Sequence, residues 1–153
     1  MLNFVNQRIK IFLFSLLVIF LCGCSSKEAK FKQAEAEFNT IVEQCVANCR
    51  KIEPPGGLAS LEKIRKKDGI YAYRKAYAEL YFKKNEALVP AEEKLDKLQD
   101  IAQGDAELTS KLVRMNAKWQ EIRFYQLFVY AKNANLLVNG KTPTVVNRSI
   151  TVN

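Results

Sequence analysis

The segment LTSKLVRMNAKWQEI, residues 108–122, carries the clearest structural signal in this chain. Its apolar residues recur at steps of four, three, four and three, and they are Leu108, Leu112, Met115, Trp119 and Ile122. This spacing aligns them on one face of an α-helix, as in helices that pack side by side. The sequence therefore predicts a long amphipathic helix, which begins at an Asp105 N-cap and ends at a Gly140 C-terminal cap.

A second long helix is expected nearer the N-terminus, from about Lys27 to Ile52. The apolar positions of this segment follow the same helical spacing, and they are Phe31, Ala34, Phe38, Ile41, Cys45 and Ile52. The sequence Pro54-Pro55-Gly56-Gly57 follows directly, and it cannot continue a helix.

Three shorter helices are predicted between the two long ones. The first covers residues 58–68 and ends near Gly69, and the second runs from Ile70 to Leu88. The third begins at Pro90, which suits a first helical turn, and ends at Gly104. The sequence thus predicts an all-α bundle of four or five helices, formed by residues 31–141 as one domain.

The C-terminal residues 142–153 carry no helical pattern and are expected to form an extended or disordered tail. Asn139-Gly140 is a hairpin-turn sequence, but Pro143 would weaken the strand after it, so the helix end is preferred there. Because the rest of the chain offers no second strand, an ordered tail would need the sheet edge of a partner protein.

The first residues have the order of an export signal. Arg8 and Lys10 precede an apolar run, Ile11 to Leu21, which is shorter than the roughly 20 residues of a membrane-spanning helix. The sequence Leu21-Cys22-Gly23-Cys24 follows, and it resembles the lipobox of bacterial prolipoproteins. The resemblance implies removal of residues 1–23 and a diacylglycerol thioether on Cys24. Cys22 is the alternative acceptor, but bulky Leu21 before it does not suit the cleavage step.

The same resemblance implies a location. Two or three fatty chains, such as palmitate, would make attachment through Cys24 nearly permanent, with residues 24–30 as anchor and short tether. Because Ser25 stands where an Asp commonly retains lipoproteins at the inner membrane, the expected site is the periplasmic face of the outer membrane. A Gram-positive source would move the anchor to the cytoplasmic membrane. An ordinary secretory signal, cut near Gly23 or Ser25, would leave no anchor.

Catalytic and metal-binding patterns are scarce. The chain has no histidine, which excludes Ser-His and Cys-His nucleophile pairs and most zinc sites. Glu92, Asp96 and Asp100 share one helix face and could serve as acid, base or calcium ligands, but a solvated helix face explains them better. We therefore expect no enzyme activity, no cofactor and no metal.

Cys45 and Cys49 are the remaining cysteines of the mature chain. An oxidising compartment would favour a disulfide between them. On a regular helix, however, side chains four residues apart are about 5 to 6 Å apart at Cβ, whereas a disulfide needs about 3.5 to 4.5 Å. A bridge would require a locally distorted helix, and two small buried side chains are the alternative.

Basic and aromatic residues alternate in one part of the chain. The basic residues of this segment are Lys63, Arg65, Lys66, Lys67, Arg74, Lys75, Lys83 and Lys84. Outside the cytoplasm such a segment could bind lipid phosphates, lipopolysaccharide, another anionic envelope polymer such as cell wall, or DNA. Tyr73, Tyr77 and Tyr81 lie on one helix face and are expected in the core.

Two functions from different classes follow. The first is a lipid-anchored, non-enzymatic structural component that binds an envelope protein near the membrane. The second is a polyanion-binding module that uses residues 63–84. Strong salt dependence of binding would favour the second. A wall-active enzyme with a lone glutamate is the least favoured hypothesis.

Overall fold

The computed structural model describes residues 26–146 and 149–151. This part of the chain contains three helices, α2 (Lys27–Lys51), α3 (Ala59–Ala102) and α4 (Ala106–Ala134), and two short strands, β1 (Thr144–Val146) and β2 (Ser149–Thr151). The all-α class is therefore confirmed, whereas the prediction of four or five helices is wrong. The expected signal peptide, Cys22 and Cys24 lie outside the described residues.

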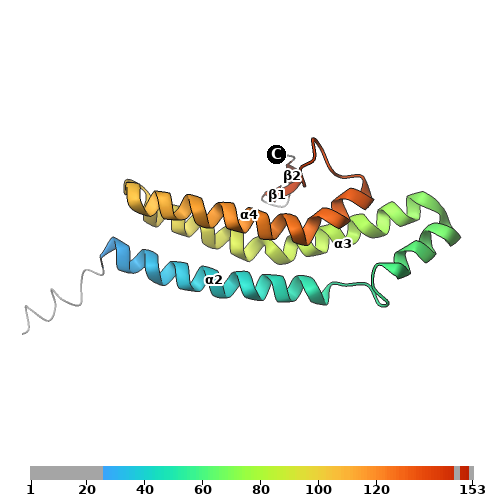
Figure 1. The fold of residues 1–153 in the computed structure, drawn as a ribbon, viewed down its shortest axis with the longest axis horizontal. Coiled ribbons are helices and arrows are strands. Elements are labelled where there is room, and N and C mark those ends of the chain that lie inside the picture. The colour runs from blue at the N-terminus through green and yellow to red at the C-terminus, as the bar shows by residue number, and fades with distance from the viewer. Residues whose placement is uncertain (1–25, 147–148, 152–153) are drawn as a thin grey trace, which may run out of the picture.

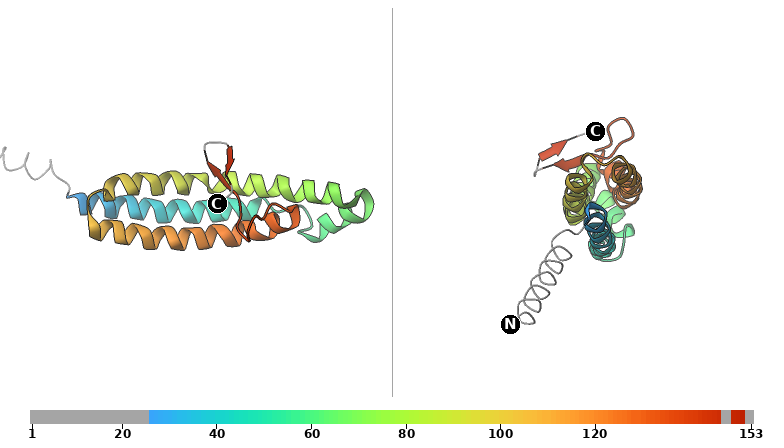
Figure 2. Two further views of the ribbon diagram at one scale, coloured as in Figure 1. Left: turned by 90° about the horizontal axis from the view of Figure 1, so that it is seen from above. Right: turned by 90° about the vertical axis from the view of Figure 1, so that its left-hand side faces the viewer.

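The three helices lie side by side and form a rod (Figure 1). Seen along the rod, they occupy the corners of a triangle (Figure 2), and their facing sides bury the core. At one end, the Lys27 ammonium at the start of α2 donates a hydrogen bond to the Gln103 carbonyl after α3. The bend of α3 at Gly69 lies at the opposite end (Figure 1).

Local hydrogen bonds mark the start of α2 and the turn that follows its end. The Ser26 hydroxyl accepts a hydrogen bond from the Ala29 amide, 3.1 Å away, which satisfies one of the free amides at the helix start. Residues 27–30 therefore belong to the helix rather than to a tether. After Lys51 the chain turns at Pro54, whose carbonyl accepts from the Gly57 amide at 2.8 Å.

Helix α3 replaces the three shorter helices that the sequence predicts. Gly69 does interrupt it, with φ 85° and ψ 179°, so the predicted break at that residue is confirmed. Pro90, however, lies inside the helix rather than at a start. The helix continues because Leu88 and Ala91 on either side are buried in the core, and this packing outweighs the one hydrogen bond that a proline lacks.

Helix α4 starts as predicted and ends earlier. One carboxylate oxygen of Asp105 accepts from the amides of Glu107 and Leu108, each at 3.0 Å, which confirms the N-cap. At the other end Asn135 takes the left-handed conformation that closes a helix, with φ 62° and ψ 38°. The prediction of a Gly140 cap is wrong.

Asn139-Gly140 forms a hairpin turn instead. Both residues have positive φ, 51° and 74°, as a two-residue type I′ turn requires. Val138 and Lys141 exchange both backbone hydrogen bonds across it, at 2.9 and 3.2 Å. The turn is too short to need a strand beyond Pro143, so the objection from that proline does not apply.

The tail is extended, and its two strands pair with each other. β1 and β2 pair antiparallel, with Thr144 opposite Thr151 and Val145 opposite Ile150. The expectation that this chain holds no second strand was wrong, because both strands come from the tail itself. No helix in the described ranges is long and apolar enough to cross a membrane.

Candidate functional site

The basic–aromatic segment divides into an exposed set and one buried residue. The exposed set comprises Lys63, Arg65, Lys66, Lys67, Arg74, Lys75 and Lys83. Lys84 is only 2% exposed and cannot bind an external polyanion, so its inclusion in the predicted site is wrong. Tyr73, Tyr77 and Tyr81 are all buried, which confirms their expected place in the core.

Lys84 instead joins three parts of the fold. Its ammonium donates to the Cys49 carbonyl at the end of α2, 2.7 Å away, and to the Glu53 carboxylate in the following loop, 3.0 Å away. It also lies 4.7 Å from the ring centre of Tyr130 on α4, whose hydroxyl donates to the same carboxylate at 2.8 Å. These hydrogen bonds from Tyr130 and Lys84 hold the pKa of Glu53 below its ordinary value.

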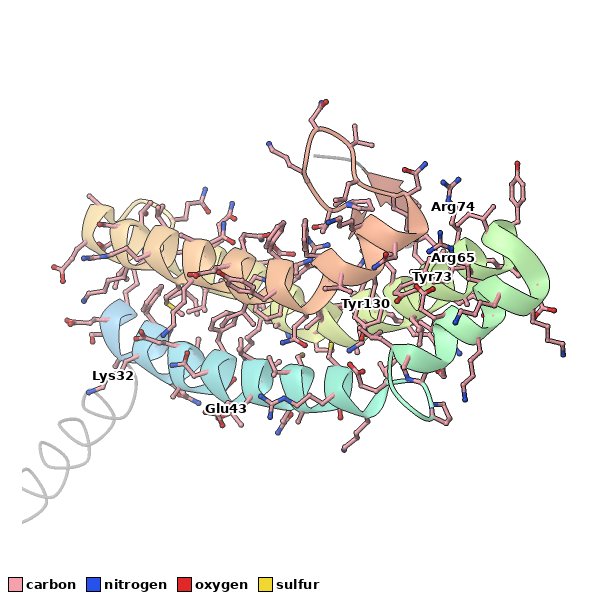
Figure 3. The ribbon with its side chains drawn as sticks, turned by 45° about the vertical axis from the view of Figure 1, so that its right-hand side comes forward. Lys32, Glu43, Arg65, Tyr73, Arg74 and Tyr130 are labelled. Atoms are coloured by element: carbon pink, nitrogen blue, oxygen red, sulfur yellow. The ribbon has the colours of Figure 1, made fainter. Side chains whose placement is uncertain are left out.

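Apart from Lys83, the exposed set gathers around the bend of α3, which we call the distal tip and define as residues 63–75. Figure 3 shows Arg65, Tyr73 and Arg74 at this end of the rod. The Arg65 guanidinium lies 5.8 Å from the Tyr73 ring centre and 3.7 Å from the Glu62 carboxylate, so Arg65 is partly engaged within the fold. Two apolar side chains at the bend face solvent, because Ile70 is 42% and Tyr71 86% exposed.

A second exposed surface lies on α4, and the sequence analysis missed it. We call it the aromatic face and define it as Phe124, Tyr125, Phe128 and Val129. Tyr125 is 70% exposed, and the ring centres of Phe124 and Phe128 are 4.9 Å apart. The sequence is apolar on several sides of the helix at Phe124, Leu127, Phe128, Val129 and Tyr130, a pattern that predicts that this half of the helix lies in the bundle centre. Leu127 and Tyr130 are buried, whereas Tyr125 and Val129 are exposed and Phe124 and Phe128 are half-buried.

A buried polar cluster fastens the tail to the middle of the rod. Arg123 on α4 donates to the Asn85 side chain at 2.8 Å and to the Pro143 carbonyl at 3.1 Å. The Tyr81 hydroxyl donates to the same carbonyl. Since Pro143 lies directly before β1, the cluster fixes where β1 leaves the helices.

One residue of the acidic face of α3, Glu92, contacts this cluster. The Glu92 carboxylate lies 2.9 Å from Nε of Arg123, while Asp96 and Asp100 are exposed. Burial raises the pKa of Glu92, and the nearby Arg123 opposes that shift. Among the described residues, no group of three or more acidic or cysteine side chains could hold a metal ion.

Cys45 and Cys49 are free thiols in the structure, so the candidate disulfide is not formed. Both are buried on the core side of α2, and the Cys49 thiol donates to the Lys84 carbonyl at 3.4 Å. Burial raises the pKa of Cys45 and raises that of Cys49 to about 11. Such thiols stay protonated near neutral pH and are poor nucleophiles.

The described residues thus present two surfaces with exposed basic or aromatic side chains, the distal tip and the aromatic face of α4. Glu53 and Arg123 were missed by sequence analysis, because their partners are distant in the chain and no local pattern marks them. No protein-family model, curated protein or solved structure matches the chain.

Proposed function

We propose that this chain is a non-enzymatic envelope lipoprotein, anchored through a lipid on Cys24, which holds a partner protein near the membrane. The observation that carries the binding role is the aromatic face of α4. Tyr125 is exposed there beside the half-buried rings of Phe124 and Phe128, and aromatic side chains are enriched at the energetic centres of protein interfaces.

The chemistry of the aromatic face suggests the kind of partner. Val129 is 39% exposed beside Tyr125, and the Lys132 ammonium lies 5.9 Å from the Phe128 ring centre at the edge of the face. A complementary surface would be apolar at its centre, with a hydrogen-bond acceptor for the Tyr125 hydroxyl. Binding of that kind depends little on salt, because the buried area is apolar.

The start of α2 supports attachment close to the membrane. Lys27 is already helical, so only Ser25 and Ser26 separate Cys24 from a rigid element. A lipid on Cys24 would therefore hold the near end of the rod at the bilayer, and the aromatic face would stand within the adjoining space.

Photocrosslinking in intact cells tests the partner. A benzophenone amino acid at position 125 should yield a discrete adduct, whereas the same group at exposed Gln120 should not. The two positions are five residues apart, which corresponds to a rotation of about 140° around α4. The Val129→Ser variant should weaken the adduct. An equal adduct yield from both positions, or none from position 125, would contradict the proposal.

A second candidate function, polyanion binding, is favoured by the exposed set of basic side chains at the distal tip. Its signature differs from that of the aromatic face, because affinity for a polyanion falls steeply as salt concentration rises. Retention on an immobilised polyanion, measured at increasing salt, separates the two candidates.

A further inference from the structure

We propose that the distal tip is a second membrane-contact site, which inserts Ile70 and Tyr71 into the interface of an anionic lipid bilayer. This inference rests on the second candidate function and names its polyanion. It is independent of both the lipid on Cys24 and the aromatic face of α4.

The bend at Gly69 creates an exposed apolar point. With φ 85° and ψ 179°, Gly69 reverses the direction of α3 and starts its long part. Tyr73, the first inward residue after the bend, is buried, as is Leu61 before it. Ile70 and Tyr71 lie at the outermost turn and face solvent. The buried side chains of Leu61 and Tyr73 hold the helix on either side of the bend.

Cationic side chains surround this point. Residues 63–75 hold six basic side chains and a single acidic one, Asp68. Apart from Arg65, none of the six forms an ion pair within the described ranges, and these five are Lys63, Lys66, Lys67, Arg74 and Lys75. Their charges are free to attract a negative surface once it is within a Debye length, about 8 Å at physiological salt.

The combination of exposed apolar and basic side chains at the tip fits a bilayer better than a soluble polyanion. A soluble polyanion is hydrated and gives no apolar environment to Ile70 and Tyr71, so it would use only the cations. A bilayer interface accepts an aliphatic side chain and favours tyrosine at headgroup depth, while its anionic lipids attract the surrounding lysines.

The tip is placed to act apart from the N-terminus. It lies at the end of the rod opposite the start of α2 (Figure 1). The long part of α3, residues 70–102, separates the two ends by about 50 Å at 1.5 Å per residue. The tip and the start of α2 are therefore separate points on the rod.

The experiment uses tryptophan fluorescence of the full chain with lipid vesicles. Trp119 is the single tryptophan and is 1% exposed, so wild-type emission should not change. The Tyr71→Trp variant places a second tryptophan at the tip. Vesicles of phosphatidylglycerol and brominated phosphatidylcholine should quench its added emission, whereas brominated phosphatidylcholine alone should not. Tyr125→Trp, an exposed tyrosine away from the tip, is the matched control and should not be quenched.

Charge reversal supplies the second arm, measured by vesicle sedimentation. Lys66→Glu with Lys67→Glu should weaken binding to the anionic vesicles by about tenfold or more. Arg114→Glu with Lys118→Glu changes the net charge equally on exposed positions of α4, and should alter binding far less.

Each contrary outcome has a distinct meaning. Lack of quenching at position 71 on anionic vesicles overturns insertion. Equal quenching at positions 71 and 125 overturns the assignment to the tip. Retention on polyphosphate without vesicle binding overturns this inference and leaves polyanion binding standing. Failure of both the polyphosphate and the vesicle measurements overturns the second candidate function as well.

Discussion

Gly69 is the residue on which the shape of the distal tip depends. Its φ of 85° with ψ of 179° is a backbone conformation that only glycine adopts readily. A Cβ there would meet no atom within 4 Å, so the cost of a side chain comes from the backbone alone. Gly69→Ala should lower the free energy of unfolding by about 1 to 3 kcal/mol, measured by denaturant titration.

The neighbouring Asp68→Ala variant is the control for that measurement. Asp68 is exposed and forms no hydrogen bond or ion pair through its side chain within the described ranges, so its removal should change stability by less than about 0.5 kcal/mol. Equal stability of Gly69→Ala and wild type would show that the bend does not require a glycine.

Trp119 tests the core at the level of one side chain. It is 1% exposed, and its ring meets that of Phe38 on α2 edge to face at a centroid distance of 6.3 Å. Trp119→Ala should cost about 3 to 5 kcal/mol of stability, because it opens a large cavity between α2 and α4. An unchanged melting temperature in calorimetry would contradict this packing.

At the level of elements, Lys84 and Glu53 should respond unequally to mutation. Removing the Glu53 carboxylate leaves the buried Lys84 ammonium without its counterion, although the hydrogen bond to the Cys49 carbonyl remains. Removing the ammonium leaves a carboxylate that is 47% exposed and still bonded to Tyr130. Glu53→Ala should therefore cost up to about 3 to 5 kcal/mol. Lys84→Met should cost only about 1 to 2 kcal/mol. Denaturant titration of both variants checks the order, and the reverse order would contradict the account.

The same contact predicts a pH dependence. Because hydrogen bonds from Tyr130 and Lys84 lower the pKa of Glu53 in the folded state, its contribution to stability is present above its ordinary pKa of 4.5. That contribution is lost as pH falls from 4.5 through the folded-state pKa. Glu53→Gln should flatten this part of the stability curve. A curve for Glu53→Gln that runs parallel to that of wild type below pH 4.5 would refute the assignment.

The elements also show which structural features are readable in sequence. The helical spacing, the Asp105 cap and the break at Gly69 were predicted correctly, because each depends on residues within a few positions. The prediction that a helix starts at Pro90 was wrong because the neighbouring residues of α3 are buried and keep the helix continuous. This burial depends on contacts with other helices, which the local sequence does not show. Lys84 was taken for a ligand-binding residue because its partners, the Cys49 carbonyl and Glu53, lie more than thirty positions away.

For the molecule as a whole, the sequence predicts the all-α fold class but does not predict which apolar surfaces stay exposed. Sequence patterns mark the apolar side of each helix, but they do not tell which apolar residues are left over once three helices have met. Tyr125 and Tyr71 are of this kind. The pairing of β1 with β2 was not predicted, because each strand has only three residues and is too short to show an alternating pattern.

Lipid labelling is the most direct test of the proposed lipid attachment at Cys24. Cells that express wild type, Cys22→Ala or Cys24→Ala are fed an alkyne analogue of palmitate, and the protein is then purified and assayed for label. We predict label on wild type and on Cys22→Ala, and none on Cys24→Ala, which should also leave the membrane fraction. Label that persists in Cys24→Ala would contradict the account.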